Sequence, residues 1–193
     1  MKYNPQIHKR RSIRLKGYDY SQAGLYFITI CCEDRICRFG KIENGKMILN
    51  DYGTIACNEW EKLPDRFVNF KLDVFQIMPN HMHGIIALKP EGATLAVAKN
   101  DDNNQYDGNV QHGNTNIAGA SPVPAVPDIV GAYKSLVANR CLKIYKSHNE
   151  TMGKLWQRNY YERIIRNHQS YENISKYILN NPAKWQEDKF HEE

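Results

Sequence analysis

Residues 78–86, MPNHMHGII, carry two histidines separated by one methionine and followed by an apolar run. On a β-strand, side chains at i and i+2 leave the same face, so His81 and His83 are predicted to project together while Met82 points into the core. Two imidazoles on one face supply half of a metal site, and Zn, Mn and Mg are metals that combine imidazole with oxygen ligands. A stacked or hydrogen-bonded histidine pair without a metal remains the alternative.

The neighbouring segments predict more β-structure. Residues 67–78 alternate apolar with polar side chains, and with residues 81–88 they predict two antiparallel strands joined by a tight Pro-Asn turn. The run 25–32, LYFITICC, is rich in β-branched and aromatic residues and predicts a buried strand. Residues 37–49 place an Asn-Gly dipeptide between two short apolar segments, which predicts a small β-hairpin.

Three segments have the apolar spacing of amphipathic helices. Residues 51–63 predict a helix that ends at Pro64. Residues 128–146 predict a long helix, with Pro127 suited to its first turn. Residues 170–181 predict a final helix, which ends there because the residue before a proline avoids the helical region.

Two further segments are less regular. Residues 89–126 consist mainly of Asn, Asp, Gly, Ala, Pro and Val, so they bury too little apolar surface to offset the entropy of ordering. We expect a long, mobile, low-complexity insertion there rather than a second domain. Residues 154–166 mix basic with aromatic side chains and predict a short strand or connector that runs into a helical turn. The chain has no internal repeat.

Composition limits the class of protein. A chain of 193 residues with 41% apolar residues has room for one domain with a sizeable core, which excludes a wholly disordered chain and a disulfide-stapled miniature. The five cysteines are odd in number and form no C-x-x-C pair, as expected for reduced thiols in a cytoplasmic protein. No run is long and apolar enough for a membrane span, and the start lacks a signal-peptide pattern.

The charge is concentrated at the N-terminus. The chain carries 26 Lys and Arg against 21 Asp and Glu, a formal net charge of +5. The first eighteen residues hold six basic residues and no acidic residue, namely Lys2, Lys9, Arg10, Arg11, Arg14 and Lys16. Such a run is either a solvated arm or an arm that binds a polyanion.

A second candidate site lies near the C-terminus. Residues i and i+4 share a face of a helix, so the Tyr177 hydroxyl and the Asn181 amide are predicted about one turn apart. A phenol beside an amide oxygen that binds a hard cation suits phosphoryl transfer, because the cation polarises the phosphate for attack by the phenolate. The alternative is a packing tyrosine followed by an asparagine that caps the helix.

Four separated blocks of the chain resemble one known family. They are RRSIRLKGYDYSQAGLYFITICC (10–32), MPNHMHGII (78–86), WQRNYYERIIRN (156–167) and YILNNPAKW (177–185). They resemble the REP-associated tyrosine transposases, which are single-tyrosine HUH nucleases related to insertion-sequence transposases. The resemblance covers nearly the whole chain except residues 89–126, and four blocks in the right order are far more specific than one His-x-His pair.

The resemblance implies a fold and a reaction. The fold is α+β, a ferredoxin-like antiparallel sheet backed by helices, with the histidine pair on a central strand. His81, His83 and Asn181 match the metal ligands for Mg²⁺ or Mn²⁺, and Tyr177 matches the catalytic nucleophile. The implied enzyme is a metal-dependent tyrosine transposase that cleaves single-stranded DNA to a 5′-phosphotyrosine and a free 3′-hydroxyl, and rejoins strands by the reverse reaction. Tyr160 and Tyr161 are competing nucleophiles without an i+4 partner.

The resemblance also implies partners. The substrates are single-stranded DNA hairpins of repetitive extragenic palindromes, and we expect a cytoplasmic, nucleoid-associated protein that does not bind membranes and is a monomer rather than a homodimer. Residues 1–24 are expected to be a basic arm and residues 25–193 the nuclease domain, interrupted at about 89–126. The expected DNA-binding residues are Arg10, Arg11, Arg14, Lys16, Lys154, Trp156, Arg158, Arg163 and Arg166. Trp156 is equally suited to the core.

Two other functions compete with this one. The first is a catalytically silent module that binds hairpin DNA or RNA, since a ferredoxin-like sheet is a familiar nucleic-acid platform. The intact set of two histidines, tyrosine and asparagine argues against it. The second is an unrelated metal-dependent hydrolase that combines His81 and His83 with Asp73 or another carboxylate, although no spacing rule brings Asp73 to the histidines. A rolling-circle replication initiator is a further alternative, close in function to the transposase.

Overall fold

The computed structural model describes residues 17–67, 69–89 and 124–191. Arg10, Arg11, Arg14 and Lys16 lie outside this part of the chain, and so does most of the expected insertion. Among the described residues, no helix is both long and apolar enough to cross a bilayer.

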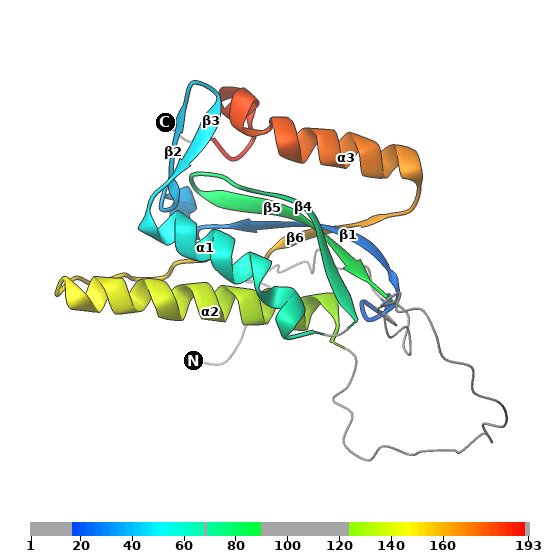
Figure 1. The fold of residues 1–193 in the computed structure, drawn as a ribbon, viewed down its shortest axis with the longest axis horizontal. Helices are drawn as coiled ribbons and strands as arrows, with labels where there is room; N and C mark the ends of the chain where they lie inside the picture. The colour runs from blue at the N-terminus through cyan, green and yellow to red at the C-terminus, as the bar shows by residue number, and fades with distance from the viewer. Residues whose placement is uncertain (1–16, 68, 90–123, 192–193) are drawn as a thin grey trace, which may run out of the picture.

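A four-stranded antiparallel sheet with the order β4-β5-β1-β6 forms the centre of the molecule (Figure 1). Its strands are β1 (Gly24–Cys31), β4 (Phe70–Ile77), β5 (His81–Leu88) and β6 (Tyr161–Ile165). The two central strands are also the most buried, so the histidine pair on β5 lies in the middle of the sheet. The expected β-hairpin is β2 (Gly40–Glu43) and β3 (Lys46–Leu49), joined through Asn44 and Gly45, both at positive φ.

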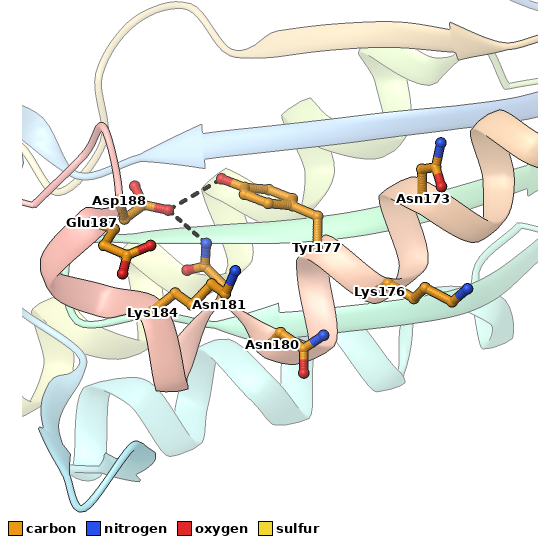
Figure 2. Close-up of a pocket in the computed structure, with 8 residues that line it drawn as sticks. All are labelled: Asn173, Lys176, Tyr177, Asn180, Asn181, Lys184, Glu187 and Asp188. Carbon is orange, nitrogen blue, oxygen red and sulfur yellow. Dashed lines mark hydrogen bonds between the residues drawn. The ribbon is translucent and has the colours of Figure 1, made fainter.

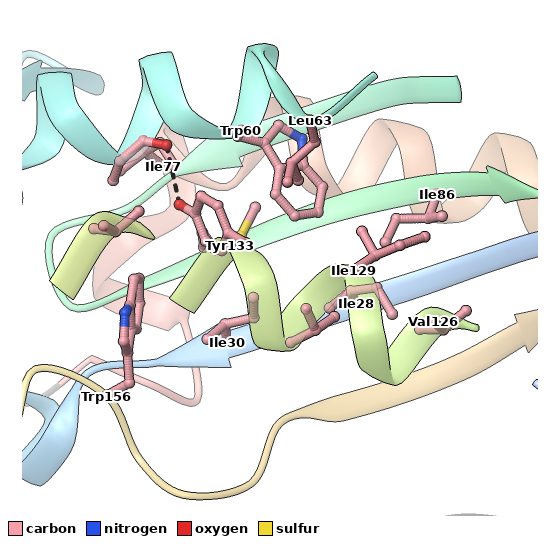
Figure 3. Close-up of a cluster of buried hydrophobic side chains, with 14 of the residues drawn as sticks. Ile28, Ile30, Trp60, Leu63, Ile77, Ile86, Val126, Ile129, Tyr133 and Trp156 are labelled. Atoms are coloured by element: carbon pink, nitrogen blue, oxygen red, sulfur yellow. Dashed lines mark hydrogen bonds between the residues drawn. The ribbon is translucent and has the colours of Figure 1, made fainter. Parts of the chain in front are cut away.

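One face of the sheet is covered by α1 (Asp51–Glu61) and α2 (Val126–Ser147), which enclose the main hydrophobic core (Figure 3). Trp60 of α1 packs directly on Gly84 of β5. A Cβ at Gly84 would lie 2.6 Å from Cζ2 of Trp60, so only glycine permits this approach. Tyr133 of α2 is fully buried, and its hydroxyl donates to the carbonyl of Ala56 at 3.1 Å. These contacts fix both helices against the strand that carries the histidines.

The opposite face is covered by α3 (His168–Asn180) (Figure 1). The helix begins at Asn167, whose side chain accepts a hydrogen bond from the Ser170 amide. Ile174 and Ile178 are one helical turn apart and pack on the sheet in a second, smaller core cluster. Tyr177 precedes the second of these anchors, so the packing of α3 sets the position of its ring.

The structure confirms the α+β class and the predicted antiparallel sheet backed by helices, but it distributes the helices over both faces. Two local predictions were inaccurate. The helix predicted for residues 51–63 ends at Glu61, and Pro64 lies in a following 3₁₀ turn. Residues 154–166 contain the strand β6 and no helical turn. The strand runs beside β1, and this cross-strand pairing decides a conformation that the mixed basic and aromatic sequence left ambiguous.

Candidate metal and nucleophile site

The two histidines of β5 face each other on the α3 side of the sheet. His81 and His83 are 0% and 1% exposed, and their Nε2 atoms lie 3.0 Å apart. Met82 is buried in the main core on the other side. The predicted common face of the histidines is therefore confirmed, and their Nε2 atoms point towards each other.

Hydrogen bonds behind the imidazoles fix how each ring presents its Nε2 atom. The amide nitrogen of Asn80 donates to the carbonyls of Arg35 and Phe190, so its Oδ1 faces Nδ1 of His81 at 2.8 Å. That oxygen only accepts, so Nδ1 of His81 carries the proton and Nε2 is a free lone pair in the neutral ring. Nδ1 of His83 lies 2.8 Å from the Thr29 hydroxyl, which can accept in the same way. This is the arrangement that orients histidine ligands of metals.

The end of α3 brings the predicted tyrosine to the same place. The Tyr177 hydroxyl lies 3.1 Å from Nε2 of His83, and the ring centroids are 5.1 Å apart. Tyr177 is 39% exposed, so a large ligand can reach its ring edge. Asn181 caps the helix and is 2% exposed, and its Oδ1 is buried with no hydrogen-bond partner among the described residues. The predicted i, i+4 pair therefore converges beside the histidines.

Asp188 completes the cluster and was missed by the sequence analysis. Figure 2 shows its carboxylate between Tyr177 and Asn181: the tyrosine hydroxyl donates to Oδ2 at 3.1 Å and the Asn181 amide donates to the same oxygen at 2.5 Å. A 3₁₀ turn over Pro182–Glu187 reverses the chain after α3 and returns Asp188 to the site. Nothing in the spacing of eleven residues between Tyr177 and Asp188 signals this contact.

The cluster opens into a groove of about 360 Å³ along α3 and the following turn (Figure 2). Its walls combine amides with charged side chains of both signs. The lining residues are Asn173, Lys176, Tyr177, Asn180, Asn181, Lys184, Glu187 and Asp188. A polar, open groove of this kind suits a polar polymer better than a small apolar ligand.

Burial and the charge of Asp188 shift the pKa values of the site residues. Burial lowers the pKa of His81 to about 4, and burial together with the neighbouring His81 lowers the pKa of His83 well below its ordinary value. Both imidazoles are therefore neutral at neutral pH, which is the form that binds metals. Burial, followed by the charge of Asp188, raises the pKa of Tyr177, so its phenol holds the proton.

The donor set fits a divalent cation. His81, His83 and Asp188 each offer one ligand atom, and these atoms lie within 4.8 Å of one another. Asn181 bonds Asp188 through its amide nitrogen, and the Oδ1 atom of the same amide is buried and unpartnered among the described residues, so it is a further neutral oxygen donor next to Asp188. Two imidazole nitrogens with carboxylate and amide oxygens suit Mn²⁺, Mg²⁺ or Zn²⁺. By contrast, Asp73 accepts the Tyr171 hydroxyl at 3.0 Å and is absent from this cluster, so the carboxylate beside the histidines is Asp188 and not Asp73.

The described residues that were expected to bind DNA lie in different environments. Trp156 is 8% exposed, packs against Phe39 and Tyr133, and donates from its indole to the Lys134 carbonyl, so it belongs to the core and offers no stacking face. Lys154 is exposed and pairs with Glu33. The remaining described residues of the set, Arg158, Arg163 and Arg166, are exposed on or beside β6.

The lowered histidine pKa values predict a pH-dependent stability. Without metal, the folded protein keeps His81 neutral while the unfolded chain, with an ordinary value of 6.5, binds a proton as the pH falls. The contribution of neutral His81 to the free energy of unfolding is therefore fully present above pH 6.5 and decreases as the pH falls towards 4. We expect the free energy of unfolding in EDTA to fall by about 2 kcal/mol more in wild type than in a variant without His81 between pH 7 and pH 5. Urea titrations of wild type and His81→Gln check this, and an equal fall in the variant would contradict it.

Comparisons with known proteins find one relative in sequence and a shared fold among solved structures. No family model matches the chain. An uncharacterised protein from Haemophilus influenzae is 40% identical over 190 residues, which span 98% of this chain and 97% of that protein. Among solved structures, a REP-associated tyrosine transposase bound to a REP hairpin is similar with a TM-score of 0.56 and 19% identity, over 91% of this chain and 76% of the other. At that identity the likeness shows a shared fold.

Proposed function

This chain belongs to the same family as the Haemophilus influenzae protein, which it matches almost end to end, and we propose that it nicks and rejoins single-stranded DNA hairpins through a 5′-phosphotyrosine intermediate. The fold shared with a REP-associated tyrosine transposase supports a transposase-like activity. That protein is bound to a REP hairpin, and we propose hairpins of repetitive palindromes as the substrates here. We further propose that the protein acts as a monomer.

One observation carries the proposal. The Tyr177 hydroxyl lies within hydrogen-bond distance of both Nε2 of His83 and Oδ2 of Asp188, at the mouth of an open groove. A packing tyrosine would bury its ring and need no such partners. An exposed phenol held against two potential metal ligands is placed to attack a phosphate that the same cluster holds.

In the proposed reaction Tyr177 is the nucleophile and Asp188 is its base. Oη of Tyr177 forms a bond to phosphorus as the bond from phosphorus to the 3′ oxygen breaks. The phenolic proton passes to Asp188, whose Oδ2 already accepts it in a hydrogen bond. The departing 3′ oxygen takes up a proton from solvent to become a hydroxyl, and Asp188 later releases its proton to solvent. One phosphodiester replaces another, so the step needs no external energy source and is reversible.

His81, His83, Asn181 and Asp188 would hold Mg²⁺ or Mn²⁺ in this scheme. The bound cation supplies a Lewis acid that withdraws charge from the phosphate and lowers the pKa of a nearby phenol. Asn80 and Thr29 keep the imidazoles in the orientation that ligation requires. Phosphate contacts away from the cluster are proposed for Arg10, Arg11, Arg14, Lys16, Lys154, Arg158, Arg163 and Arg166.

The experiment that tests this function does not require the substrate to be known. A pool of single-stranded DNA hairpins with randomised single-stranded flanks is labelled at the 3′ end and incubated with the full chain and Mn²⁺. A 5′-phosphotyrosine keeps the 3′ part of the DNA on the protein, so the label should migrate with the protein in a denaturing gel. Sequencing of the captured DNA then identifies the hairpin. Cleavage that leaves no labelled protein would instead indicate attack by water.

Asp188 provides a separate prediction. Asp188→Asn keeps the size of the side chain but removes its capacity to take the phenolic proton, and it also replaces a charged metal ligand by a neutral one. At Mn²⁺ concentrations that saturate the variant, we expect cleavage to slow by about a hundredfold. The loss should shrink as the pH is raised, because the phenol then ionises without a base. Asn180→Asp, at an exposed position of the same groove, is the matched control. Faster cleavage by Asp188→Asn would contradict the role and would show that this carboxylate shields the tyrosine.

A further inference from the structure

The sheet register places a second tyrosine on the same side as the metal cluster. Thr29 of β1 pairs with His83 on one side and with Tyr161 of the edge strand β6 on the other. Directly paired residues of antiparallel strands project from the same face. Tyr161 therefore faces the side on which the cluster lies, two strands away from His83. Arg163 pairs with Phe27 and faces the same side.

Aromatic rings connect Tyr161 to the histidines. The Phe190 ring lies 5.8 Å from the Tyr161 ring, 5.9 Å from His83 and 4.8 Å from His81, measured between centroids. Phe190 is 2% exposed, whereas Tyr161 is 43% exposed. Phe190 thus supports the inner edge of the Tyr161 ring and leaves its outer part open to solvent, next to the cluster.

The surroundings of this open ring are cationic. The Lys189 ammonium lies 5.8 Å from the centroid of the Tyr161 ring and 4.7 Å from that of Phe190. The exposed Arg163 follows Tyr161 by two residues on the same face. The intervening Glu162 projects from the opposite face, because neighbours on a strand alternate. Asp188 is the nearby acid, and it is occupied by Tyr177 and Asn181.

We propose that Tyr161, flanked by Arg163 and Lys189, is a stacking platform for an unpaired base of single-stranded DNA next to the cleaved phosphate. The inference deepens the proposed function, on which it rests, by assigning where the strand beside the break lies. An exposed aromatic ring between two cations is the arrangement that binds single strands: the base stacks on the ring and the phosphates pair with the cations. The platform also gives Tyr161 a role other than that of a competing nucleophile.

Binding of a short fluorescein-labelled oligothymidylate to the full chain in EDTA tests the platform, because stacking tolerates any base and binding needs no cleavage. Tyr161→Ala should weaken binding by about tenfold, whereas Tyr161→Phe, which keeps the ring, should stay within about twofold of wild type. Arg163→Ala should reduce the slope of log affinity against log salt by about 0.7. Arg66→Ala, an exposed arginine after α1, is the matched control and should change neither value.

The outcomes separate this inference from the proposed function. Equal binding by wild type and Tyr161→Ala, or no binding of oligothymidylate by wild type, would overturn the platform even if the tyrosine adduct forms. Tighter binding of oligouridylate than of oligothymidylate would assign the surface to RNA and would also overturn it. If no adduct forms while Tyr161→Ala still weakens binding, the proposed nicking activity fails, and Tyr161 is supported as a surface that binds single strands but not as one beside a cleaved phosphate.

Discussion

Tyr177→Phe should abolish both DNA cleavage and the covalent adduct, with a loss of at least about a thousandfold in rate. The substitution removes only the phenolic oxygen, which is the proposed nucleophile. The ring is retained, so its contacts with Phe27 and His83 remain, and stability should change by less than about 1 kcal/mol. The 3′-labelled hairpin pool measures the adduct, and thermal unfolding measures stability.

The controls for this prediction are the neighbouring tyrosines on and before β6. Tyr160→Phe and Tyr161→Phe should each form the adduct at close to the wild-type rate. Mass spectrometry of the adduct peptide should locate the DNA on Tyr177. An adduct on Tyr160 or Tyr161 would refute the assignment of the nucleophile but keep the reaction class, whereas an adduct formed by Tyr177→Phe at the normal rate would refute both the residue and the geometric argument.

Replacing either buried histidine should remove metal binding and metal-dependent cleavage together. His83→Ala takes away one ligand and also a contact of the Tyr177 hydroxyl, so we expect cleavage to fall by at least about a hundredfold, and His81→Ala should do the same. Titration calorimetry with Mn²⁺ measures the site directly, without DNA. Both variants should still bind oligothymidylate, because neither histidine belongs to the proposed platform of Tyr161, Arg163 and Lys189.

Asn181→Ala should slow cleavage less than either histidine variant. It removes one neutral oxygen ligand while both imidazoles remain, so we expect a loss of about tenfold at low Mn²⁺ that is partly restored at high Mn²⁺. Asn173→Ala, at the far end of the same groove, should have little effect.

Normal Mn²⁺ binding by both histidine variants would show that the pair is structural and would remove the metal from the site.

Local patterns in the sequence predicted much of the fold and part of the site. The His-x-His pair on a strand projects from one face because the strand period is two, and the Asn44-Gly45 hairpin forms because both residues adopt positive φ. Tyr177 meets His83, and both Tyr177 and Asn181 meet Asp188, because the helix repeat puts them on one side. Each of these predictions depends on residues that are close along the chain, where backbone geometry alone sets the relation between side chains.

The tertiary structure decided the features that depend on distant residues. Asp188 reaches the cluster because a 3₁₀ turn reverses the chain, and Trp156 enters the core because it packs between Phe39 and Tyr133; neither contact has a spacing rule. The pairing of Thr29 with both His83 and Tyr161 arises from a register between strands that are far apart in sequence. The sequence thus pointed to two histidines, a tyrosine and an asparagine as candidate site residues. Long-range packing determined that they meet and that Asp188 joins them, because contacts between remote segments are set by the whole core and by no local period.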